Sequence, residues 1–134
     1  MPIVYALEPG LSAAEFRAVL IASTLGERRP VHEPVRLEQM LRQADVIVTA
    51  RAGERLVGVS RAITDFAYCC YLSDLAVDTA YQQQGIGKRL VEETRRAAGE
   101  AAMLVLIAAP AAEGYYPKIG MQHVKSGWLI PRSS

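Results

Sequence analysis

A glycine- and glutamine-rich segment has the composition of a phosphate-binding loop, and it consists of Gln82, Gln83, Gln84, Gly85, Ile86, Gly87 and Lys88. Two closely spaced glycines let the backbone turn tightly and come close to a ligand. A helix that begins here presents unpaired N–H groups at the positive end of its dipole. Such a helix start suits a phosphate or pyrophosphate. The alternative interpretation is an ordinary helix start after a turn.

Two other glycine motifs match this segment poorly. A nucleotide-hydrolysing P-loop needs glycine at position 82 and serine or threonine after Lys88, where this chain has Gln82 and Arg89. A dinucleotide-binding fingerprint needs glycine at position 90, where the chain has Leu90. Magnesium-dependent nucleotide hydrolysis is therefore disfavoured, as is a dinucleotide cofactor.

The elements that must position this loop predict a mixed α/β layer. Ser12 and Glu15 form a capping box that predicts a helix start. Apolar residues at helical spacing predict further helices after Pro34 and over 86–98, and a short one over 111–119. Strands are expected at 3–7, 46–48, 56–59, 67–77, 103–107 and 121–130, the fifth of them buried on both faces. This order predicts an antiparallel meander that leads into a right-handed β-α-β crossover.

Length, composition and charge exclude several classes of protein. The 134 residues fit one domain, 1–134, and the net charge of +1 argues against a protein that coats nucleic acid. Cys69 and Cys70 are adjacent and poorly placed to pair, while His32 and His123 lack the spacing of metal ligands. No signal peptide and no apolar stretch of membrane-spanning length is evident. We therefore expect a cytoplasmic protein with no metal and no membrane partner.

Two motifs together resemble signatures of the GNAT superfamily of N-acetyltransferases. The first is matched by Gln82, Gly85 and Gly87, and the second by Ala112, Tyr115, Tyr116, Gly120 and Met121. The resemblance covers nearly the whole chain. It implies the α/β (α+β) acyl-CoA N-acyltransferase fold, with a mixed central sheet, helices on both faces, and splayed fourth and fifth strands. A bulge in the fourth strand is part of that expectation.

The resemblance also implies an acetyl-CoA-dependent acetyltransferase that acts by direct attack of a primary amine. The pyrophosphate of acetyl-CoA would bind the N–H groups of residues 82–88, and its pantetheine arm would pair with Leu75, Ala76 and Val77. Tyr116 would protonate the leaving thiolate, whereas Tyr115 is interpreted as a packing residue. Asp74 could accept the amine proton, or it could be a structural residue while water serves as the base.

The identity of the acceptor and the assembly state are left open by these motifs. A small-molecule or peptidyl amine is the expected partner, nucleic acid is not, and a homodimer involving Trp128 and Leu129 is one option. Arg28, Arg29 and Arg36 would border the acceptor cleft, where we interpret them as solvated side chains. The alternative function is a non-catalytic acyl-CoA-binding or sensing module.

Overall fold

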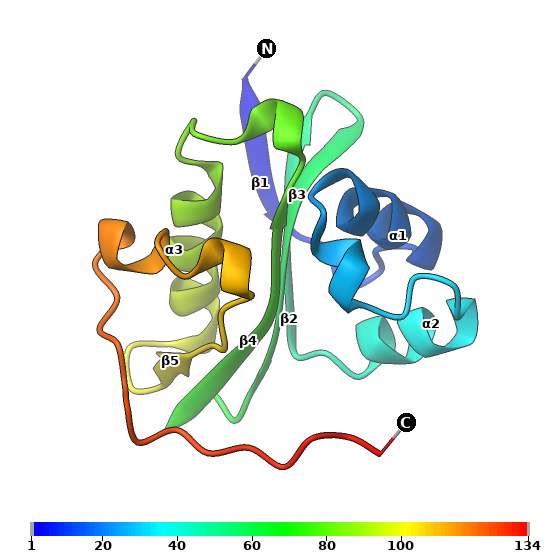
Figure 1. The fold of residues 1–134 in the computed structure, drawn as a ribbon. Coiled ribbons are helices and arrows are strands. Elements are labelled where there is room, and N and C mark those ends of the chain that lie inside the picture. The colour runs from blue at the N-terminus through cyan, green and yellow to red at the C-terminus, as the bar shows by residue number, and fades with distance from the viewer. Residues whose placement is uncertain (1, 134) are drawn as a thin grey trace.

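The computed structural model describes residues 2–133, in which a five-stranded mixed sheet carries helices on both faces (Figure 1). The strands lie in the order β1-β2-β3-β4-β5 and comprise β1 (Ile3–Leu7), β2 (Val46–Ala52), β3 (Arg55–Thr64), β4 (Cys69–Val77) and β5 (Met103–Val105). The first four strands pair in antiparallel fashion. Helix α3 (Ile86–Ala98) connects β4 to β5, which are parallel. The predicted fold class is confirmed.

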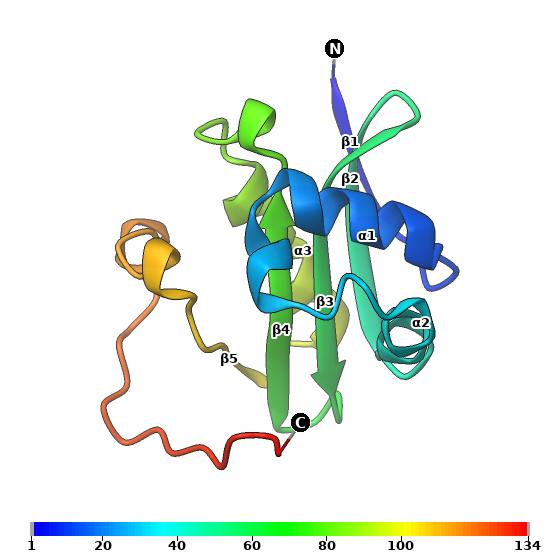
Figure 2. The same cartoon turned by 45° about the vertical axis from the view of Figure 1, so that its right-hand side comes forward.

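Helices cover the two faces of the sheet unequally (Figures 1 and 2). Helices α1 (Ala13–Ala22) and α2 (Pro34–Arg42) lie on one face with the short 3-10 turn η1 (Leu25–Arg28), while α3 covers the other. Both faces bury apolar side chains, which include Phe16, Leu20, Leu37, Ile47, Val59 and Ala76 under α1 and α2, and Val48, Ala50, Val57, Leu72, Ile86 and Leu90 under α3. None of the helices in the described part of the chain is long and apolar enough to cross a membrane.

Helix α1 is fixed at its start by the predicted capping interaction. The Ser12 hydroxyl accepts a hydrogen bond from the Glu15 N–H at 3.1 Å, as expected for an N-cap. Arg51 of β2 then joins this first turn to the sheet, because its guanidinium pairs with Glu15 at 2.7 Å and with Glu8 at 2.8 Å. These contacts hold the first turn of α1 against the sheet.

The end of the chain differs from the expectation. Strand β5 covers only Met103–Val105 and is largely exposed, so its burial on both faces was wrongly predicted. The helix expected over 111–119 is replaced by two 3-10 turns, η3 (Pro110–Ala112) and η4 (Tyr116–Ile119). Gly114 and Pro117 explain this break, because glycine weakens a helix and proline removes a backbone donor. The strand expected over 121–130 is not formed.

Candidate active site

A gap opens between β4 and the last strand of the sheet, β5. Ser73 is bulged out of β4, since Arg61 pairs with Asp74 and the next residue of β3, Ala62, pairs with Leu72. Pairing of β4 with β5 is confined to its first residues and ends at Tyr71 opposite Val105. The expected bulge and the expected splaying of these strands are therefore both present. The segment 75–77 of β4 continues past this point without a β5 partner.

The glycine-rich loop lies at the carboxyl end of β4, beside the gap. Its backbone turns sharply, with a φ of 63° at Gln83 and of 82° at Gly85, the N-cap of α3. Only glycine adopts the latter conformation without strain. The Gln82 side chain donates a hydrogen bond to the Val77 carbonyl at 3.0 Å, which ties the loop to the strand. The loop thus exposes residues 82–85 immediately before a helix start, a suitable geometry for an anion.

The two adjacent tyrosines pack on different neighbours. Their rings meet edge to face with centroids 5.3 Å apart. The phenol oxygen of Tyr115 accepts a hydrogen bond from the Lys88 backbone. It lies so close to Gly87 that a Cβ placed there would be 2.5 Å from the hydroxyl. Tyr115 is therefore in contact with the glycine-rich loop, in addition to its expected packing role.

Tyr116 is half-buried and keeps its proton at neutral pH. Burial raises the pKa of its phenol, and the neighbouring Tyr115 raises it further, whereas the positive charge of Arg29 lowers it. Burial is the largest of these influences, so the net pKa lies above the ordinary value of 10.0. A phenol in this state can donate a proton to a thiolate.

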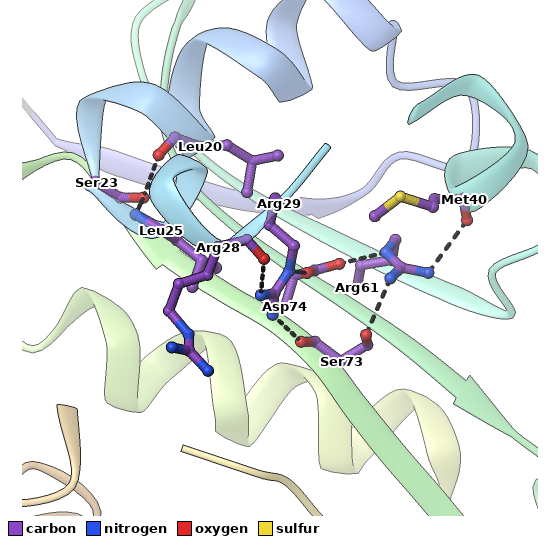
Figure 3. Close-up of polar contacts among 9 residues, drawn as sticks. All are labelled: Leu20, Ser23, Leu25, Arg28, Arg29, Met40, Arg61, Ser73 and Asp74. Atoms are coloured by element: carbon purple, nitrogen blue, oxygen red, sulfur yellow. Dashed lines mark hydrogen bonds and ion pairs between the residues drawn. The ribbon is translucent and has the colours of Figure 1, made fainter. Parts of the chain in front are cut away.

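Asp74 is engaged by two arginines on the face of β4 that α1 and α2 cover (Figure 3). Its side chain is completely buried, one carboxylate oxygen accepts from Arg29 Nε, and the other accepts from Arg61 Nε. Arg29 Nη2 also donates to the Ser73 carbonyl at 2.8 Å, and Arg61 Nη2 donates to the Ser73 hydroxyl at 3.0 Å. The bulge is thus held from both sides by guanidinium groups.

Sequence reasoning missed the part that these arginines play. Arg29 was interpreted as solvated, and this was wrong, because its side chain is only 21% exposed and pairs with Asp74. Arg36 is a surface residue as expected, pairing with Glu33 at 3.4 Å. A charged residue within the apolar run of β3, Arg61, was a signal that a buried partner must exist. The register that identifies the partner depends on the bulge, which the sequence does not specify.

No group of three or more histidine, cysteine, aspartate or glutamate side chains within residues 2–133 is arranged to hold a metal ion. The functional groups at this site include a phenol, backbone amides, a buried carboxylate and guanidinium groups.

Comparison with known families identifies the class of protein that this fold and site define. The model of the Acetyltransferase (GNAT) domain family matches residues 23–127, which is more than half of the chain. The chain therefore belongs to the GNAT acetyltransferases.

Individual relatives are similar over either a short segment or the whole fold. Histone acetyltransferase TAP1 of Glycine max is 44% identical over 43 residues, which are 32% of this chain and 19% of that protein. GCN5-related N-acetyltransferase 2 of Arabidopsis thaliana is 46% identical over 44 residues, 33% of this chain and 17% of that protein. The chain thus covers only about a fifth of the length of these curated relatives.

Solved structures match over the full chain at low identity. A GNAT family acetyltransferase from Streptococcus pneumoniae superposes with a TM-score of 0.81 at 24% identity, covering 99% of this chain and 100% of that one. AAC(6')-Iy, solved with the bisubstrate analogue CoA-S-monomethyl-acetylneamine, gives a TM-score of 0.74 at 14% identity, with full coverage of both chains. At these identities the likeness establishes the shared fold.

Proposed function

We propose that the chain transfers the acetyl group of acetyl-CoA to a primary amine by direct attack. The observation that carries this proposal is the gap between β4 and β5. The loop 82–88 follows β4 at one end of this gap, and the 3-10 turn that begins at Tyr116 follows β5 in the chain. An extended thioester substrate could enter such a gap and pair with the free edge of β4. The membership in the GNAT acetyltransferases supports acyl transfer as the reaction.

The residues present fit acetyl-CoA as a substrate. The amides of residues 82–88 would bind its pyrophosphate, because they precede and begin α3. Gly87 is buried, and its lack of a side chain makes room for the Tyr115 hydroxyl, which packs against the start of α3. The pantetheine arm would lie along Leu75, Ala76 and Val77, where β4 has no β5 partner. A backbone N–H of this segment would stabilise the oxyanion of the tetrahedral intermediate.

In the proposed reaction, the neutral amine nitrogen forms a bond to the acetyl carbon and the carbon–sulfur bond breaks. Tyr116 donates its proton to the departing sulfur, and its raised pKa means that the phenol still holds this proton at neutral pH. The proton of the amine leaves through water. Both oxygens of Asp74 are already engaged by guanidinium groups, which supports an anchoring role for this carboxylate over the role of base.

Replacing Tyr116 with phenylalanine tests the proposal. Loss of the proton donor is expected to lower kcat by about 10²-fold or more, while the Kd for coenzyme A changes little. Tyr68→Phe is a matched control, because Tyr68 is 76% exposed on the turn before β4. Thiol release is measured with acetyl-CoA and a panel of amines. Parent-like turnover of Tyr116→Phe would contradict the role of this phenol, and saturable binding without thiol release by the parent would favour the non-catalytic acyl-CoA-binding module.

A further inference from the structure

The turn η1 is fixed over the centre of β4 by the side chain of Arg29. Three donors of this guanidinium are in use, because Nη2 binds the Ser73 carbonyl, Nε binds Asp74, and Nη1 donates to the Arg28 carbonyl at 2.9 Å. Arg28 is thereby held beside the bulge, next to the place where β4 and β5 separate. Its position does not depend on a flexible loop.

The Arg28 side chain leaves this cluster and is exposed. Figure 3 shows that it extends from η1 across β4, away from Asp74 and Arg61. Among residues 2–133 it forms no ion pair. The other nearby arginine on the adjoining segment, Arg36, is already paired with Glu33. Arg28 therefore presents a positive charge that forms no ion pair within the described residues, although the exposed Glu27 precedes it in the same turn.

The charges beside the gap do not cancel. Arg28, Arg29 and Arg61 contribute three positive charges, and Asp74 and Glu27, the neighbour of Arg28 in η1, contribute two negative charges. The positive potential reaches the reaction centre, since the charge of Arg29 is felt at the Tyr116 phenol. A polycationic acceptor would be repelled by this arrangement, whereas an anionic group on the acceptor would be attracted.

The arginine side chains near Ser73 lie apart from the loop that would bind the phosphates of acetyl-CoA. The loop 82–88 follows the carboxyl end of β4, whereas Arg29 binds the strand near its middle, at Ser73. A residue adjacent to Arg29 is thus placed on the acceptor side of the thioester. The anions of acetyl-CoA would be bound by the loop and do not account for Arg28.

We infer that the acceptor is an amine that also carries a carboxylate, and that Arg28 is the residue that selects it. This inference rests on the proposed acetyltransferase function and specifies its substrate class. It distinguishes this chain from the neighbours of the same fold that are named as aminoglycoside acetyltransferases.

The test uses unbranched primary amines in sets of equal length that end in a methyl group, a carboxylate or a second amine. Within at least one length, the carboxylate member is expected to give a kcat/KM at least about tenfold above both of its counterparts. Arg28→Gln should reduce this preference about two- to fivefold, in line with an exposed charge pair. Added salt should reduce the preference of the parent as well. Arg36→Gln is the matched control and should retain the parental preference.

The outcomes separate this inference from the function on which it rests. Thiol release that is equal or faster with methyl- or ammonium-ended amines at every length would overturn the carboxylate acceptor and leave the acetyltransferase intact. An unchanged preference in Arg28→Gln would overturn the role of Arg28. Absence of thiol release with every amine, despite binding of acetyl-CoA, would refute the acetyltransferase function and this inference with it.

Discussion

Replacing Asp74 with asparagine separates an anchoring role of this carboxylate from the role of base. The Asp74 side chain is fully buried, and each of its oxygens accepts from a different guanidinium. Asparagine preserves the shape but offers one oxygen and an amide that is itself a donor. Either Arg29 or Arg61 therefore loses its acceptor and faces a donor group in a buried position.

The expected cost follows from the burial of the three groups. Removing one partner of a buried ion pair costs about 3–5 kcal/mol. Arg29 is 21% exposed and can regain some hydration, so we expect about 3 kcal/mol for Asp74→Asn. Urea unfolding measures this change. Asp78→Asn is the matched control, because the Asp78 carboxylate is also buried but its partner Arg55 is 62% exposed. This substitution should lower the free energy of unfolding by about 1 kcal/mol or less.

The pH dependence of the variant distinguishes the two roles. An anchor that holds Arg29 and η1 in place would lower kcat/KM at every pH and leave the shape of the profile unchanged. A base would lose the acidic limb of that profile when its ionisable group is removed. Parental stability together with a lost acidic limb would refute the anchoring role, because it would show that the arginines do not need this carboxylate and that catalysis does.

Two further predictions concern the loop and the turn before β4. Gly87→Ala places a methyl group 2.5 Å from the Tyr115 hydroxyl and should raise the Kd for coenzyme A, measured by calorimetry, at least about tenfold. Gly114→Ala is the control, because no atom lies within 4 Å of a Cβ at that position, and it should bind coenzyme A like the parent. Equal affinity of both variants would contradict a role of the loop in binding. Backbone N–H groups of residues 67–69 lower the pKa of Asp65 to about 2, so its stabilisation is present above pH 4 and is lost as the pH falls toward 2. An NMR titration of Asp65 with a midpoint near the ordinary aspartate pKa of 3.8 would contradict this.

Local signals predicted much of the site. The capping box at Ser12 and the glycine at position 85 each act within a few residues, so the sequence alone identifies the start of α1 and the turn before α3. The apolar stripe of α3 likewise depends only on its own periodicity. These elements position the loop 82–88, which is why its place at the end of β4 was predictable.

The pairing of Arg29 and Arg61 with Asp74, and the structure of the end of the chain, could not be predicted from neighbouring residues alone. The pairing of Arg61 with Asp74 depends on the register of β3 and β4, and the Ser73 bulge shifts that register by one residue. The segment 121–130 has the apolar content of a strand, yet Trp128 is 95% exposed and Ile130 is 96% exposed. A strand forms only where a neighbouring edge pairs with it, and composition does not reveal whether that edge is available.

The distribution of charge in this site bears on how the amine becomes reactive. The net charge of the chain is only +1, but three arginines, Arg28, Arg29 and Arg61, lie near the β4 bulge with two carboxylates, Asp74 and Glu27. A positive environment disfavours an ammonium ion, so an acceptor amine in this gap would lose its proton more readily than in water. The same charges would attract a carboxylate on that acceptor and keep it bound after the proton has left. An acceptor with both groups would therefore be deprotonated without a dedicated base, and Asp74 could remain committed to its arginines.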